Sequence, residues 1–158
     1  MYFKPILVLA ATFIASSASA QVLTVRGEAG RSTQLSAQAL AALPHVSITT
    51  GEHGRSVTYD GVPLSTLTAL VGAPQGEALR GPAFAMVVIV TAQDGYRIVL
   101  SLAETDPSIR AERSIIADRA DGAPLDARSG PFRLVVEGDK RPARAARNVQ
   151  SIEVKTLP

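Results

Sequence analysis

Residues 84–100 of the chain read FAMVVIVTAQDGYRIVL. The first part, Phe84 to Thr91, is apolar at nearly every position, which is typical of a strand buried on both faces. Asp94 and Gly95 form a dipeptide that favours a tight turn, and Tyr96 to Leu100 has the composition of a second strand. This stretch therefore predicts a hairpin whose first strand lies inside a sheet.

Other short stretches are rich in β-branched residues and end at turn signals. We expect further strands at 22–26, 46–50, 56–59, 114–117, 132–136 and 149–154. Residues 51–54 would join two of them as a loop or hairpin. Because strands outnumber helices and the turns are short, the fold class is expected to be α+β, with mostly antiparallel or mixed sheets.

Two short helices are expected between these strands. Ser36 suits the N-cap of the first, Leu35 would pack against Leu40 across the cap, and Pro44 would stop the last turn. In the second helix we expect Pro63 at the first position and an apolar stripe after it. The expected stripe and end signals are Leu64, Leu67, Leu70, Val71, Gly72 and Pro74.

The first twenty residues have the order of a secretory signal peptide. Lys4 precedes an apolar run from Ile6 to Ala15, and Ala18-Ser19-Ala20 supplies the small residues of a cleavage site. The run is shorter than the ~20 apolar residues that span a bilayer, so no membrane span is expected after cleavage. We expect cleavage before Gln21, a domain at residues 21–158 and a periplasmic location.

Charge and cysteine content exclude several classes of function. The chain has 16 basic and 14 acidic residues and no cysteine. Without Lys4 the basic excess is one, which is too small to indicate general nucleic-acid binding. The lack of cysteine excludes disulfides and thiolate chemistry.

A basic segment near the C-terminus is the main candidate site for an anion. Lys140, Arg141, Arg144 and Arg147 follow Gly138. If Pro142 opens a helical turn, Arg141 and Arg144 would share a face near its N-terminus and could bind phosphate or carboxylate. A solvated basic surface is the alternative interpretation.

Other chemistry-bearing residues give no catalytic site. His45, Glu52 and His53 are the only histidine-centred metal candidates, and the histidines are expected at opposite ends of a strand, so no metal site is predicted. A Gly-x-Ser-x-Gly nucleophile motif is absent. Glu104 and Asp106 precede a proline and are expected to form a turn or face solvent. Catalytic residues are therefore unassigned.

Several segments, taken in order, resemble the sulfite-oxidase-type molybdopterin-binding domain in its small exported form. The matching segments are Leu40-Ala41-Ala42-Leu43-Pro44, Tyr59-Asp60-Gly61-Val62-Pro63-Leu64, Asp94-Gly95-Tyr96, Asp121-Gly122-Ala123-Pro124-Leu125, Gly130-Pro131-Phe132-Arg133-Leu134-Val135-Val136, Gly138-Asp139-Lys140-Arg141 and Ile152-Glu153-Val154. The resemblance implies the family's α+β fold and, by analogy, a site for a pterin or similar anion.

A departure from the family pattern and, independently, the signal peptide weigh against molybdenum chemistry. The family holds molybdenum through a cysteine before the Gly-Val-Pro-Leu motif, and the nearest positions here are Thr49 and Thr50, whose hydroxyls cannot replace a soft thiolate. Both threonines also suit an ordinary strand. In addition, enzymes of this type that carry the cofactor outward generally use a twin-arginine signal, and no Arg-Arg pair occurs in the first twenty residues.

Three functional hypotheses remain. The leading one is a periplasmic domain of this fold without molybdenum chemistry and with no cofactor, which binds a small anionic ligand or an envelope protein partner. The second is a molybdopterin-dependent oxidoreductase with a non-cysteine metal site. The third is a structural interaction module without a ligand.

Overall fold

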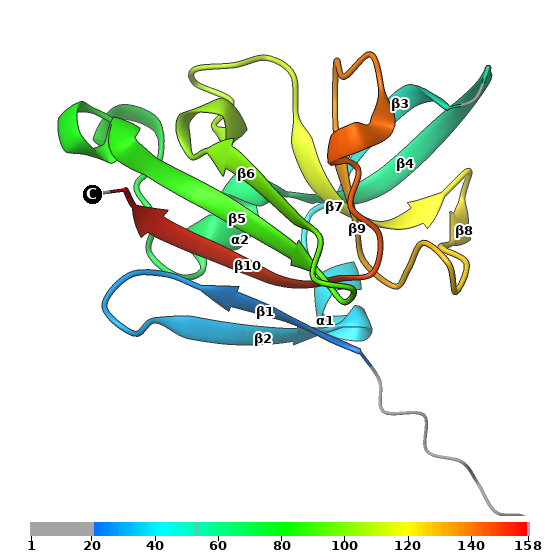
Figure 1. The fold of residues 1–158 in the computed structure, drawn as a ribbon, viewed down its shortest axis with the longest axis horizontal. Helices are drawn as coiled ribbons and strands as arrows, with labels where there is room; N and C mark the ends of the chain where they lie inside the picture. The colour runs from blue at the N-terminus through cyan, green and yellow to red at the C-terminus, as the bar shows by residue number, and fades with distance from the viewer. Residues whose placement is uncertain (1–20, 53, 158) are drawn as a thin grey trace, which may run out of the picture.

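The computed structural model describes residues 21–52 and 54–157. The predicted signal peptide and His53 lie outside these described residues. Five strands form a first sheet in the order β2-β1-β10-β5-β6 (Figure 1). All neighbouring pairs are antiparallel except β1 and β10, which run parallel. The strands are Val22–Arg26 (β1), Ser32–Ser36 (β2), Met86–Ala92 (β5), Arg97–Ser101 (β6) and Val149–Thr156 (β10).

A second sheet has the order β3-β4-β7-β8, and β9 also pairs with β7. Every pairing within it is antiparallel. Its strands are Val46–Glu52 (β3), Arg55–Pro63 (β4), Ser114–Ala120 (β7), Ala123–Pro124 (β8) and Arg133–Val136 (β9). The described residues thus form an α+β structure with two mostly antiparallel sheets, as expected from the sequence.

The two sheets share one buried cluster, and a smaller cluster lies apart from it. Leu23, Val88 and Ile152 of the first sheet are fully buried together with Val62 and Leu134 of the second. A smaller cluster in the second sheet contains Ile48, Tyr59, Ile115, Ala117 and Val135. β4, β7 and β9 contribute to both clusters, so these strands are apolar on both faces.

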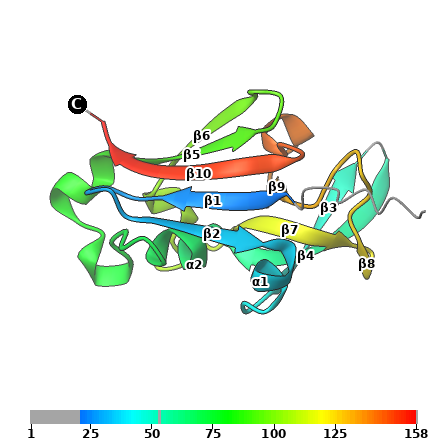
Figure 2. The ribbon, with the colours of Figure 1, turned by 90° about the horizontal axis from the view of Figure 1, so that it is seen from below.

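The helices are short. They are Ala37–Ala41 (α1) and Leu64–Ala69 (α2), with 3-10 turns at Gly76–Ala78, Gly81–Ala85, Ala103–Thr105 and Pro142–Arg144. Figure 2 shows α1 and α2 on one side of the sheet that carries β1, β2 and β10. In the part of the chain that the structure describes, no helix has the length and apolar character to cross a membrane.

The predicted hairpin and the first helix are confirmed. β5 and β6 pair as expected across Asp94-Gly95, where the Asp94 carboxylate accepts a hydrogen bond from the Tyr96 backbone N–H at 2.9 Å. Ser36 caps α1, because its hydroxyl accepts a hydrogen bond from the Ala39 N–H at 3.1 Å. Leu35 and Leu40 belong to the same buried cluster.

Three local expectations were wrong. Phe84 lies in a 3-10 turn with 54% exposure and β5 begins only at Met86, because a proline stands at the start of that turn. Pro63 is the last residue of β4, where it pairs with Ile115, and it serves as the N-cap of α2. Leu70 is 48% exposed because α2 ends at Ala69.

Strand β2 was not anticipated. Of its five residues only Leu35 is apolar and buried, so Ser32–Ser36 lacks the alternation by which strands are recognised. It forms at the edge of the first sheet because β1 offers it five registered partners, from Val22 to Arg26.

Gly61 lies where the backbones of β4 and β7 come close together. The register between the strands shifts between Asp60 and Gly61. A Cβ atom on Gly61 would lie 2.3 Å from the Ile116 carbonyl oxygen and 2.5 Å from the Ala117 Cα. Since both neighbours are backbone, neither can rotate away, and only glycine fits this position of the Tyr59–Leu64 segment.

Arg113 and Glu137 join the start of β7 to the end of β9. The Arg113 Nε and Nη2 atoms donate to the two carboxylate oxygens of Glu137 at 2.9 and 3.0 Å. The Arg113 backbone N–H donates to the same carboxylate, and the Glu137 N–H donates to the Arg113 carbonyl. These hydrogen bonds from Arg113 lower the pKa of Glu137 below its ordinary value.

We predict that Gly61→Ala lowers the free energy of unfolding by about 1–3 kcal/mol or more, because the added methyl group overlaps backbone atoms of β7. Urea denaturation measures the change. Gly51→Ala is the matched control, since nothing lies within 4 Å of a Cβ there and a change of less than about 0.5 kcal/mol is expected. Equal destabilisation by both substitutions would contradict this interpretation.

A second prediction concerns acid stability. Because the folded-state pKa of Glu137 is lowered, its contribution is complete above its unfolded pKa, near 4.5, and is lost as the pH falls through the folded value. We expect Glu137→Gln to lower the free energy of unfolding at pH 7 by at most about 1 kcal/mol. The deficit should shrink below pH 4, as measured by urea denaturation across pH. A deficit that stays constant with pH would contradict the prediction.

Candidate functional site

The segment from Asp139 to Asn148 leads into β10 and contains the predicted basic residues. Its end is held by Asn148, which has a left-handed backbone conformation with φ of 50°. The Asn148 N–H and side-chain amide donate to the carbonyls of Ser129 and Arg128, each at 3.1 Å. Its carbonyl accepts from the Gln93 N–H at 2.9 Å. Asn148 therefore joins this segment to the loop before β9 and to the β5–β6 hairpin.

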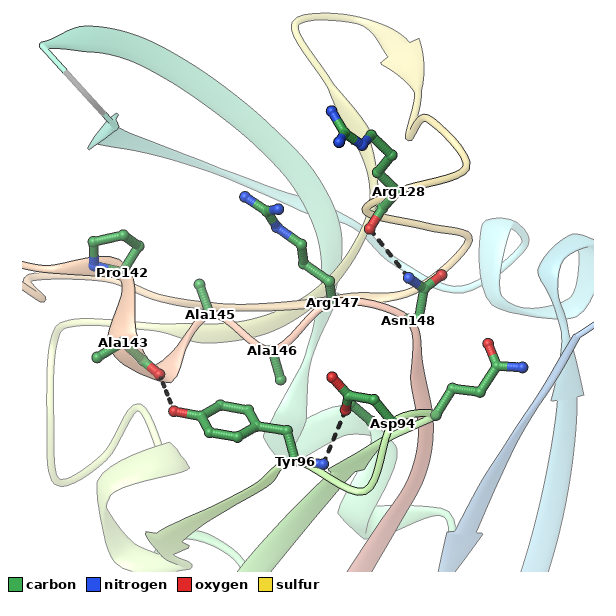
Figure 3. A pocket seen from close by; sticks show the side chains of 11 residues that line it. Asp94, Tyr96, Arg128, Pro142, Ala143, Ala145, Ala146, Arg147 and Asn148 are labelled. Carbon is green, nitrogen blue, oxygen red and sulfur yellow. Dashed lines mark hydrogen bonds between the residues drawn. The ribbon is translucent and has the colours of Figure 1, made fainter.

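A cavity of about 490 Å³ lies where these three segments meet. Figure 3 shows its lining, in which the Tyr96 hydroxyl donates to the Ala143 carbonyl at 2.8 Å. This volume lies within the range of small-molecule sites. The lining residues are Ala92, Gln93, Asp94, Tyr96, Arg128, Pro142, Ala143, Ala145, Ala146, Arg147 and Asn148.

Two arginines of the cavity are exposed and point the same way in Figure 3. Among residues 21–52 and 54–157, neither Arg128 nor Arg147 has a carboxylate oxygen within the 4 Å of an ion pair. Hydrogen bonds from Ser129 lower the pKa of the neighbouring Asp126, and the backbone N–H and the charge of Arg128 lower it further. The guanidinium groups thus remain accessible to a ligand.

Arg147 also lines a second cavity, of about 340 Å³, so it stands between the two. Arg133, which is only 3% exposed, contributes to this second cavity. The Arg133 Nη1 donates to the Tyr59 hydroxyl at 2.6 Å, and its guanidinium lies 4.8 Å from the centre of the Tyr59 ring. A buried arginine and an exposed one therefore line the second cavity together, and the exposed one also lines the first.

Arg144, which the sequence suggested as an anion ligand, is engaged by carboxylates. Its Nε and Nη2 atoms donate to the two Asp139 oxygens at 3.0 and 2.6 Å, and Nη1 donates to Glu104 at 2.9 Å. The hydrogen bonds that Arg144 donates to Asp139, followed by the one that it donates to Glu104, raise the pKa of Arg144. The expected helical turn is a three-residue 3-10 turn, Pro142–Arg144, which is too short to supply a helix N-terminus.

The remaining predicted site residues are dispersed. Thr50 lines a small cleft together with Asp139 and Pro142, so the structure does bring it beside the basic segment. Thr49 is exposed, and its hydroxyl lies 3.0 Å from that of Thr58 on β4. Lys140 and Arg141 are also exposed.

The other polar candidates have structural partners. The His45 Nδ1 lies 2.7 Å from the Leu43 carbonyl oxygen, and Nε2 lies 3.3 Å from both oxygens of Asp118. Asp106 accepts hydrogen bonds from Gly76 and Ser108. Burial acts to raise the pKa of Asp106, but these hydrogen bonds together lower it.

Sequence reasoning missed three parts of the cavity. Tyr96 was assigned only to a strand, and Arg128 and Asn148 received no role. Asparagine tolerates positive φ better than most residues, so Asn148 before a strand was a weak local signal. Nothing in the sequence near Arg128 indicated that its loop returns to residues 143–148, because that approach depends on contacts between distant segments.

The donor groups do not fit molybdenum held by a protein thiolate. The sequence has no cysteine, and Thr50, near the expected position, offers only a hydroxyl. Within the described residues, no three histidine, aspartate or glutamate side chains gather where they could share a metal ion. His53 and the side chain of Glu52, two of the metal candidates in the sequence, lie outside this test.

Comparisons with known proteins give a relation in fold. No protein-family model matches the chain, and no curated protein matches it. Among solved structures, the sulfane dehydrogenase SoxCD from Paracoccus pantotrophus matches with a TM-score of 0.64 and 18% identity over 87% of this chain. The match spans 39% of that protein's chain. The protein therefore has the sulfite-oxidase-like fold that its sequence segments indicated, as a distant relation.

Proposed function

We propose that this protein is a periplasmic domain that binds a small anionic ligand in the cavity lined by Arg128 and Arg147, without molybdenum redox chemistry. The observation that carries the proposal is the pair of exposed arginines without ion pairs, within the described part of the chain, beside a cavity of about 490 Å³. A guanidinium group matches the planar oxygens of phosphate and carboxylate, and two such groups favour an anion over a neutral ligand.

The charged side chains that line the cavity favour an anionic ligand. The acidic lining residue, Asp94, uses one oxygen to hold the Tyr96 N–H at the hairpin turn. The charges of the lining are then two arginines against one aspartate, and in the adjoining cavity Asp126 lies with Arg133 and Arg147. Tyr96 adds a ring to the same lining, which suits a ligand that has a flat apolar part as well as a charged group.

Two features support a function outside molybdenum chemistry. The sequence contains no thiolate ligand, and its N-terminal segment lacks the arginine pair of a signal for folded export. A chain exported unfolded would reach the periplasm without a cofactor made in the cytoplasm. Binding of an anion requires neither a thiolate ligand nor a cofactor made in the cytoplasm.

We predict that Arg147→Gln weakens the binding of inorganic pyrophosphate about ten- to a hundredfold, because a charge-assisted hydrogen bond of roughly 1.5–3 kcal/mol is lost. Arg128→Gln should weaken it in the same direction. Isothermal titration calorimetry of the mature chain at 0.15 M salt measures both. Arg26→Gln is the matched control, since Arg26 is exposed on β1 and lines neither cavity. Unchanged affinity in the Arg147 variant, or an equal loss in the Arg26 variant, would refute this site.

Elemental analysis tests the chemistry independently. We expect protein purified from its native envelope to contain no stoichiometric molybdenum and no fluorescent oxidised pterin, because the chain offers no thiolate ligand. Stoichiometric molybdenum together with a pterin would instead support the oxidoreductase hypothesis with a non-cysteine metal site.

A further inference from the structure

We infer that Arg144 is a positioning residue: held by Asp139 and Glu104, it fixes the wall of the anion cavity without touching the ligand. The predicted effect of Arg144 on ligand binding rests on the proposed function. Its effect on the order of residues 139–148 does not depend on that function. Arg144 stands in the middle of the segment that supplies Pro142, Ala143, Ala145 and the residues after them to the lining.

The segment has little regular structure to hold it. Between β9 and β10 it forms only one 3-10 turn, closed by the hydrogen bond from the Ala145 N–H to the Pro142 carbonyl. At its far end Asn148 is tied down, the Ala146 carbonyl accepts from the Leu134 N–H of β9 at 2.8 Å, and Tyr96 holds the Ala143 carbonyl. The Arg144 side chain is the charged anchor between Asp139 and the rest of the fold.

Arg144 has the geometry of a bidentate anchor. Its fork meets both Asp139 oxygens, and its third nitrogen reaches Glu104 in the 3-10 turn Ala103–Thr105, forty residues away in sequence. The side chains are only partly exposed, at 33% for Arg144, 20% for Asp139 and 27% for Glu104. A planar guanidinium fixes two carboxylates in direction as well as distance, which a lysine ammonium cannot do.

Arg144 and Arg147 differ in the number of carboxylates beside them. Two carboxylates face Arg144, so its positive charge is already compensated within the segment, and an incoming anion would have to displace them. Arg147, three residues later, has no such partner among the described residues. One arginine of the segment therefore serves the shape of the cavity and the other its charge.

The two possible roles of Arg144 predict opposite effects for Asp139→Asn. If Arg144 bound the ligand, freeing it from Asp139 would strengthen pyrophosphate binding. If it positions the wall, the same substitution loosens the segment and weakens binding about five- to tenfold, as expected when the binding-competent arrangement is populated only a fraction of the time. Removal of a negative charge favours an anion, so weaker binding could not arise from electrostatics alone.

The experiment measures pyrophosphate affinity at 0.15 M salt and backbone hydrogen exchange for the wild type, Asp139→Asn, Glu104→Gln and Arg144→Lys. We expect all three variants to bind more weakly and to exchange the Ala145 and Ala146 amides faster, while the β5 amides remain protected. Arg144→Lys keeps the positive charge. Weaker binding by this variant than by the wild type would therefore identify the planar guanidinium geometry as the requirement.

Other outcomes separate the two claims. Tighter binding in Asp139→Asn, or wild-type exchange rates at residues 145 and 146 in all variants, would overturn the positioning role. If the wild type itself does not bind pyrophosphate, the proposed function fails. The exchange rates then still decide whether Arg144 orders the segment.

Discussion

Strand β10 lies in the middle of the first sheet, where it pairs with β1 on one side and β5 on the other. Its pairing with β1 is parallel, so no tight turn can join the two strands and almost the whole described chain runs between them. Insertion of β10 carries the preceding segment against the tip of the β5–β6 hairpin, where Asn148 bonds to Gln93. The cavity thus forms because the pairing of β10 between β1 and β5 brings residues 139–148 against the hairpin.

The arginines around this closure fall into different physical environments. Arg133 is buried against the Tyr59 ring, Arg144 is fixed between two carboxylates, and Arg128 and Arg147 are exposed. The same residue type therefore contributes packing, positioning and accessible charge within a small part of the molecule. A basic cluster in a sequence is a poor guide to ligand binding when acidic partners such as Glu104 come from distant segments.

Much of the fold followed from local patterns. The hairpin around Asp94-Gly95 and the Ser36 cap of α1 are confirmed because turn and cap preferences act within a few residues. Edge strand β2 was not foreseen, since its place depends on partners in β1 and not on its own alternation. Phe84 was misplaced because it belongs to a proline-containing 3-10 turn before β5, and Leu70 was misplaced because α2 ends at Ala69.

By itself, the sequence determined the class of fold, the main strands and the absence of thiol chemistry, because hydrophobic periodicity, turn residues and cysteine content are properties of the chain alone. Only the tertiary structure decided which arginines are accessible. It set Asp139 and Glu104 on Arg144, and it brought Arg128 beside Arg147 through Asn148. Glu104 lies forty positions from Arg144 and Arg128 lies twenty positions from Asn148, so no local pattern encodes these two pairings.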